Sequence, residues 1–235
     1  MPALERFIRL PARGAPRGVI LQYGYSPGAS VQYHLNVSIH REREGVPEPT
    51  SAQHEVLEAS LRLSCVDVNA DNSVHLLVEH EPLSHYVDGE YIFPPGRSTF
   101  EFHQTSFGEP VGSPFRSDVV NLILPRMAVW VDSTWAEVER FVPPRYEAMV
   151  ERVRTFRVTE INDALIHISF DSPPVIYHTQ DEWSAYALNQ KGSYVFDSTY
   201  GVVLEQHIEA SMLGREGDML YEVQTTYDLT VHDEE

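Results

Sequence analysis

Period-two alternation of apolar and polar side chains runs through this chain and restricts what it can fold into. In residues 31–39, and again in residues 57–65, the odd positions are apolar and the even positions are polar. Residues 221–231 repeat the pattern, with one threonine among the apolar positions. A helix would distribute these apolar positions around its circumference, whereas a strand places them on one face. The pattern therefore predicts strands with one buried face.

Shorter alternations at residues 100–103, 164–170 and 202–212 predict further strands, separated by clusters of Gly, Pro, Asn and Asp. We expect helix only in residues 133–142, where Ser133 caps the segment TWAEVERF, and as a turn in residues 183–188. The expected fold class is all-β with minor α. It is an antiparallel curved sheet or open half-barrel, built from two similar β-meander halves of roughly five strands each.

Short motifs recur in the same order in the two halves of the chain. The sequence GEYIF at 89–93 is echoed by GSYVF at 192–196. Upstream of these, the segment that starts at Cys65 resembles the one that starts at Arg157, since both alternate, pass through an Asn/Asp turn and alternate again. Because the matching motifs occur in the same order in both halves, they predict an internal duplication.

The net charge is strongly negative and unevenly distributed. The chain carries −18, and four arginines against one glutamate give residues 1–18 a charge of +3, which leaves −21 for the remainder. Such a field repels nucleic-acid backbones and anionic lipid surfaces, so we expect no nucleic-acid partner. We predict a basic N-terminal arm over 1–18, either frayed or docked on a partner. The rest, 19–235, is predicted to be a single β domain of two pseudo-repeats, about 19–125 and 126–235.

Neither a membrane span nor a disulfide is expected. No apolar run approaches the roughly 18–20 residues that cross a bilayer, and the N-terminal residues lack the apolar stretch of a secretory signal. We therefore expect a soluble cytoplasmic protein, or an exported one if a leader has been removed. Cys65 is the single cysteine and falls at an apolar strand position, which predicts a buried small hydrophobe rather than a nucleophile.

Metal sites receive little support from the residue pattern. The eleven histidines include pairs on a common strand face, such as His34 and His40, but no three or four ligands converge in the sequence. Residues 67–71 imitate the start of a calcium loop, yet Asn72 and Val78 stand where that loop requires glycine and glutamate. Asn and Asp favour turns, so this segment is predicted to be a hairpin turn. We expect no metal and no cofactor.

Catalytic signatures are also missing from the sequence. No GxSxG elbow, phosphate loop, dinucleotide fingerprint or HExxH motif occurs. The most interesting single residues are His103 and His207, because the repeat places them at comparable points beside Glu101 and Glu205. Both histidines occupy the polar phase of their strands, where exposure to solvent is the ordinary outcome. No catalytic residue is assigned.

Two stretches of the chain resemble known proteins. LQYGYSPGASVQYHLNVSI, residues 21–39, and GSYVFDSTYGVVLEQHIEASM, residues 192–212, precede a long Thr-rich closing strand. They are similar to poorly characterised bacterial β proteins of the lipoprotein-carrier-like half-barrel type, and together they cover about a sixth of the chain. The resemblance implies a curved antiparallel sheet that wraps an apolar groove.

Three functions are compatible with these features. The favoured hypothesis is a noncatalytic binding or assembly protein that contacts a protein partner or a second copy through its acidic surface and strand edges. The first alternative is a carrier of a hydrophobic small molecule or lipid in a half-barrel groove. The second alternative is an enzyme that uses histidine and carboxylates, and the sequence favours a noncatalytic role over it.

Overall fold

The computed structural model describes residues 18–44, 52–112, 122–141, 149–178, 184–216 and 219–232. These residues form one twelve-stranded antiparallel sheet. Its strands are β1 (Ser30–Glu44), β2 (Ala52–Val68), β3 (Ser73–Val87), β4 (Glu90–Tyr91), β5 (Ser98–Thr105), β6 (Pro110–Val111), β7 (Thr134–Phe141), β8 (Val150–Asn162), β9 (Leu165–His178), β10 (Ser184–Asp197), β11 (Val202–Glu216) and β12 (Met219–Val231).

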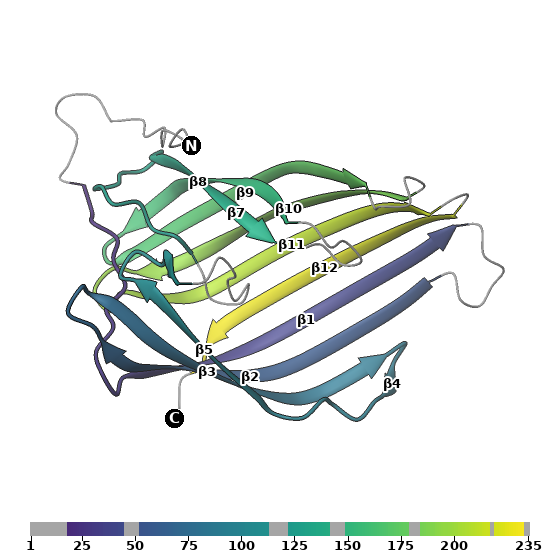
Figure 1. Cartoon of the computed structure of the whole chain (residues 1–235), viewed down its shortest axis with the longest axis horizontal. Helices are drawn as coiled ribbons and strands as arrows, with labels where there is room; N and C mark the ends of the chain where they lie inside the picture. The colour runs from purple at the N-terminus through teal and green to yellow at the C-terminus, as the bar shows by residue number, and fades with distance from the viewer. Residues whose placement is uncertain are drawn as a thin grey trace.

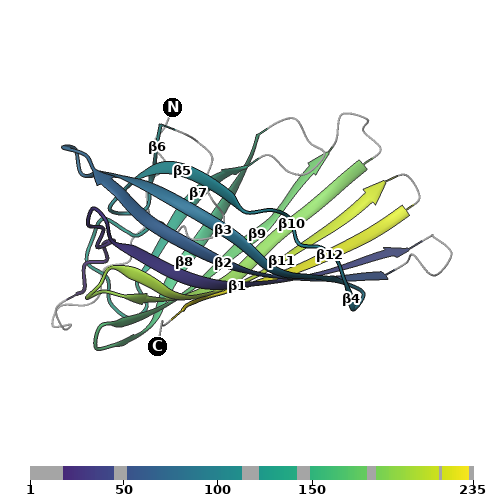
Figure 2. The same ribbon diagram turned by 90° about the horizontal axis from the view of Figure 1, so that it is seen from below.

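The first and last strands lie side by side in the middle of the sheet. The strand order is β6-β5-β3-β2-β1-β12-β11-β10-β9-β8-β7, with β4 paired to β3. Within the described ranges the edge strands β6 and β7 do not pair with each other, so the sheet is open and curved rather than a closed barrel (Figures 1 and 2). The predicted all-β, open and curved architecture is confirmed.

The strongly alternating segments are strands with the predicted buried face. On β1 the side chains of Tyr33, Leu35 and Val37 are buried, and Leu229 on β12 pairs with Leu35. We call the face that carries these residues the inner face, and the opposite one the outer face. The alternation determines which face becomes the inner one, because all the apolar side chains of a strand lie on the same side and are removed from water together.

The predicted helices are wrong. Residues 134–141 form β7, paired with β8 through the register Trp135↔Phe156, and Ser184–Leu188 belong to β10. Trp183 lies outside the described residues. In β7 the inward positions after Trp135 are Glu137 and Glu139, so a search for apolar alternation does not detect this strand.

Two apolar clusters cover the inner face. One cluster gathers residues of β8–β11 with segments that precede β1 and β7, and includes Leu21, Phe156 and Phe196. The other lies on β1, β2, β3 and β12. Tyr25 and Tyr227 pack against both clusters, so the seam between the two halves of the sheet runs beneath them.

Segments outside the regular strands cover one end of the inner face, which we call the covered end. The other end of the strands, where β9–β12 finish or begin near residues 176, 187, 213 and 220, is the far end. At the covered end, Val19 and Val129 exchange backbone hydrogen bonds of 2.9 and 2.8 Å. Trp135 Nε1 donates to the carbonyl of Ile123 at 2.9 Å. These bonds hold the segment around Val19 against the segment before β7, and hold that segment against Trp135 of β7.

The pseudo-repeat stays a prediction. The two hairpins that it aligned, β2–β3 and β8–β9, both turn through a residue with positive φ, Asn72 at 62° and Asp163 at 53°. The two GxYxF motifs occupy different places. Gly89 sits in a turn before β4, whereas Gly192 lies inside β10. The basic arm falls almost wholly on residues 1–17, which lie outside the described residues.

Candidate functional site

An apolar hollow of about 340 Å³ lies on the inner face at the covered end. Its walls come from the segment before β1, from β1 and β2, from the β10–β11 turn with the start of β11, and from the end of β12. The lining residues are Tyr23, Gly24, Tyr25, Ala29, Ser30, Val31, Tyr33, Leu63, Cys65, Tyr200, Val202, Leu204 and Val231. The volume lies at the lower end of the roughly 300–1,000 Å³ typical of small-molecule sites.

Tyrosine rings form one wall of the hollow. Tyr23 and Tyr25 stack with ring centroids 5.3 Å apart, and Tyr23 meets the edge of Phe196 at 5.7 Å. The Tyr23 hydroxyl donates to the carbonyl of Leu122 at 2.9 Å, and Gln104 Nε2 donates to the Tyr25 hydroxyl at 2.8 Å. Burial raises the pKa of both phenols well above the usual value. Both therefore remain neutral hydrogen-bonding groups at physiological pH.

A close backbone crossing holds the segment before β1 in place. Gly24 N donates to the carbonyl of Gly201 at 3.0 Å, and Gly201 has a φ of +66°. A side chain at Gly24 would run into the Tyr200 carbonyl, so the crossing requires glycine on both sides. Tyr200 itself is 71% exposed at the edge of the hollow.

A buried amide lies next to this hollow along β11. Gln206 is 3% exposed, two residues beyond Leu204, and sits between Tyr194 of β10 and Leu229 of β12. Its Oε1 has no hydrogen-bond partner in the described part of the chain. A buried acceptor without a donor costs roughly 1–3 kcal/mol, so such atoms are usually satisfied by a water or a ligand. Gln206 is therefore a buried acceptor on the strand that contributes Leu204 to the hollow, and it is not itself one of the lining residues.

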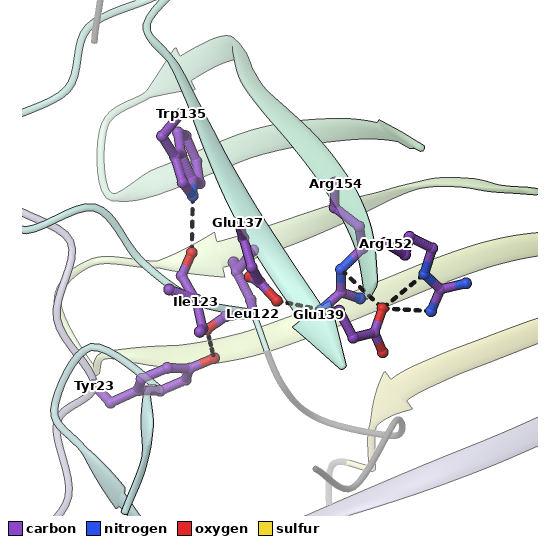
Figure 3. Close-up of polar contacts among 8 residues, drawn as sticks. All are labelled: Tyr23, Leu122, Ile123, Trp135, Glu137, Glu139, Arg152 and Arg154. Atoms are coloured by element: carbon purple, nitrogen blue, oxygen red, sulfur yellow. Dashed lines mark hydrogen bonds and ion pairs between the residues drawn. The ribbon is translucent and has the colours of Figure 1, made fainter. Parts of the chain in front are cut away.

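Four charged side chains are buried on the inner face of β7 and β8 (Figure 3). Arg154 Nη2 donates to Glu137 Oε1 at 2.7 Å, and Arg152 Nε donates to Glu139 Oε2 at 2.8 Å. All four residues are 3–6% exposed. Because β7 is an edge strand, inward-pointing charges of this kind also discourage pairing with another sheet.

The charges of this cluster balance, which limits its chemistry. Burial alone lowers the pKa of Arg154, but the charges of Glu137, Tyr194 and Glu139 and the bond to Glu137 raise it overall. Arg154 is thus cationic, and each carboxylate has an arginine partner. Such an arrangement is a structural ion-pair cluster that fastens β7 to β8, and neither carboxylate is positioned as a general acid or base.

The structure does not bring the candidates from the sequence together. Glu101 and His103 lie on β5, where Glu101 Oε2 is 3.0 Å from His75 Nε2 and the rings of His75 and His103 stack at 4.5 Å. His207 and the exposed Glu205 lie on β11. Five pairing steps separate β5 from β11, which corresponds to about 24 Å. All of these groups lie away from the hollow.

His207 belongs to a surface network on the outer face. Its Nδ1 lies 2.6 Å from Asp228 Oδ1 and its Nε2 lies 3.3 Å from Glu209 Oε1, while the other carboxylate oxygen of Glu209, Oε2, pairs with Lys191. The bond to Asp228 raises the pKa of His207 above its usual value of 6.5. The pair therefore contributes its full stability below about pH 6.5, and this contribution is lost as the pH rises through the pKa of the folded state.

We predict that replacement of Asp228 by asparagine lowers the pKa of His207 toward 6.5, because the main hydrogen-bonded charge is removed. The measurement is an NMR titration of the imidazole resonances. Glu205→Gln is the matched control, since Glu205 is exposed on the same strand, whereas the hydrogen-bond partners of His207 are Asp228 and Glu209. An unchanged titration in Asp228→Asn would contradict the network.

Metal and thiol chemistry gain no support in the part of the chain that the structure describes. No group of three or more His, Cys, Asp and Glu side chains there could hold a metal ion. The segment from Asp67 is a hairpin turn, as predicted, in which Asp71 Oδ1 accepts a bond from the Ser73 amide at 2.9 Å. Cys65 is buried as predicted, and burial followed by the charge of Asp67 raises the pKa of its thiol.

Comparison with known proteins adds no relative. No protein-family model matches the sequence, and a search of curated proteins found no match. None of the described residues forms a helix of the length and apolarity needed to cross a membrane. The residues that define the hollow were missed by sequence reasoning. The nearest signal was the tyrosine-rich segment at residues 21–39, for which the resemblance implied an apolar groove without indicating which residues line it.

Proposed function

We propose that this protein is a noncatalytic carrier that binds a hydrophobic small molecule in the inner-face hollow. The observation that carries the proposal is the lining itself, in which apolar and tyrosine side chains from distant segments border a hollow of about 340 Å³. Binding sites typically combine such a lining with a few polar contacts, and here the Tyr25 side chain, which lines the hollow, carries a hydroxyl that can supply one. The resemblance to carrier half-barrels supports the same proposal.

The composition of the lining also favours binding over catalysis. It contains no histidine, lysine or carboxylate among the described residues, which are the usual general acids and bases. Its thiol, on Cys65, is buried, with a raised pKa that keeps it protonated. The sequence favoured protein contact over small-molecule carriage, and the apolar lining of this hollow supports placing carriage first in the proposal.

Native mass spectrometry of the gently purified protein tests for a resident ligand. We expect extra mass that disappears on denaturation. Titration with Nile red, a neutral apolar dye, tests the hollow itself, and we expect a blue-shifted, saturable emission. Ala29→Trp should weaken dye binding by at least about tenfold, because Ala29 is exposed and its substituent would enter the hollow.

Ala52→Trp is the matched control, because Ala52 is an exposed alanine at the start of β2, outside the lining. Equal dye binding in both tryptophan variants and the unmodified chain would reject the proposed site.

A second candidate function is contact with a protein partner or with a second copy of the chain. It is favoured by exposed apolar side chains on the outer face, where Ile176 is 68% and Leu213 is 58% exposed. These two side chains lie on β9 and β11, on either side of β10, and a contiguous exposed apolar patch of this kind is typical of interaction surfaces. The −21 charge of residues 19–235 argues against a nucleic-acid partner for either function.

A further inference from the structure

An apolar patch lies on the outer face at the far end of the sheet. The register Ile176↔Ala187↔Leu213 places three apolar positions in one row across β9, β10 and β11. Leu220 of β12, 47% exposed, joins them beside Arg215. These four apolar residues border a hollow of about 340 Å³. We call Ile176, Ala187, Leu213 and Leu220 the far-end patch.

The row of residues next to Leu213 consists of Tyr186, Gly214 and Tyr221. Gly214 has the Tyr186 ring packed so closely that a Cβ there would lie 2.9 Å from it, and Tyr221 packs against the same position. The two tyrosine rings meet edge to face with centroids 5.7 Å apart. Strand alternation places Gly214 and the two rings on the inner face, so only the backbone of this row lies between Leu213 and Leu220 on the outer face.

Acidic side chains surround the patch. The row that contains Leu213 continues through Glu222 of β12 to Glu42 of β1. Glu44 of β1 pairs with Leu220. Arg215 is the single base among the described residues that line this hollow. An apolar recess with a mostly acidic rim is complementary to a segment that combines apolar side chains with arginines.

We propose that the far-end patch binds the N-terminal segment, residues 1–17, of a second copy of this chain. The segment reads MPALERFIRLPARGAPR, carries +3, and places Phe7, Ile8 and Leu10 between arginines. The rest of the chain carries −21, so a second copy attracts this basic segment electrostatically. The arginines match the acidic rim, and the apolar side chains match the recess.

The geometry points to a second copy rather than to the same chain. The described chain begins at Gly18, and Val19 is paired with Val129 at the covered end. Leu213 lies ten residues along β11 from Val203, a buried member of the cluster at that end, which is about 33 Å. Residues 7–10 precede Gly18 by eight to eleven residues, which span at most about 26–40 Å when fully extended.

Binding within one chain would therefore require nearly complete extension and a path around to the outer face. Exchange between two copies has no such restriction. When each copy gives its segment to the other, both patches are filled and the assembly closes as a two-fold dimer.

The test uses the full chain in sedimentation velocity at rising protein concentration and at low and high NaCl. We expect a dimer whose dissociation constant increases at least about tenfold in Leu213→Asp and in the double variant Arg6→Gln/Arg9→Gln. The dimer should also weaken at high salt, because exposed charges are screened. Leu83→Asp is the control, since Leu83 is 50% exposed on β3, outside the patch, and should leave the dimer unchanged.

A photo-cross-linking measurement keeps the proposal testable if a variant folds poorly. Benzoylphenylalanine replaces Phe7 in ¹⁵N-labelled chain, which is mixed with unlabelled chain and irradiated. We expect mixed-isotope cross-links to peptides that contain Ile176 or Leu213. Cross-links confined to one chain, cross-links to other strands, or a monomer at every concentration would overturn the proposal. Nile red binding to the inner hollow is read separately and does not depend on this result.

Discussion

Replacement of Glu139 by glutamine is expected to lower the free energy of unfolding by about 3–5 kcal/mol. Arg152 Nε donates to Glu139 Oε2 at 2.8 Å, and the two residues are 4% and 3% exposed. Removal of one partner leaves a buried guanidinium without its counter-charge, which is much more costly than the loss of an exposed pair. The measurement is urea denaturation followed by tryptophan fluorescence or circular dichroism.

Glu151→Gln is the matched control for this prediction. Glu151 pairs with Arg140 at 2.9 Å between the same two strands, but both side chains are more than half exposed. Solvent screens such a pair, so we expect a loss below about 1 kcal/mol. A comparable loss in both variants would show that Glu139 is not in a water-excluded environment.

The double variant Glu139→Met/Arg152→Met separates charge from packing. Methionines of similar length remove both charges together, and we expect most of the stability lost in Glu139→Gln to return. This result would assign the cluster to the attachment of β7. No recovery would indicate that the polar atoms are required for the packing of β7 and β8.

The alternation in the sequence predicted the strands whose inner faces are apolar. It succeeded for β1 because Tyr33, Leu35 and Val37 are all removed from water on one side. It failed for β7, where the inner positions after Trp135 are glutamates. A buried glutamate is compatible with a strand only when an arginine lies opposite, and that pairing depends on the register of β7 with β8.

The site was harder to predict because it is formed by residues far apart in the chain. Tyr25 and Cys65 meet Tyr200 and Val231 only after the chain ends become neighbours through the β1–β12 pairing. The histidines attracted attention by residue type, but strand phase placed His207 on the outer face. Residue type alone does not reveal which face of a sheet is covered. The crossing of the segment before β1 with the β10–β11 turn does reveal it, because that crossing lies on the inner face.

The crossing of Gly24 and Gly201 gives the second large expected effect. We predict that Gly201→Ala lowers the free energy of unfolding by about 3–5 kcal/mol and weakens Nile red binding. Its φ of +66° strains any side chain by about 1–2 kcal/mol, and the added Cβ would lie against the Gly24 amide and 2.6 Å from the Gln22 carbonyl oxygen. These are backbone atoms, so relief requires the segment before β1 to move.

Gly28→Ala isolates the steric part of this effect. Gly28 has a φ of +82°, but no atom lies within 4 Å of an added Cβ, so only the conformational strain of about 1–2 kcal/mol is expected. Urea unfolding measures the stability of both variants. Dye binding is then titrated without denaturant, at a temperature at which both variants are folded. If Gly201→Ala unfolds like Gly28→Ala and still binds dye fully, the close crossing does not form the wall of the hollow. If Gly201→Ala alone loses dye, displacement of Tyr25 and Tyr200 from the lining accounts for the loss, because both tyrosines adjoin the crossing.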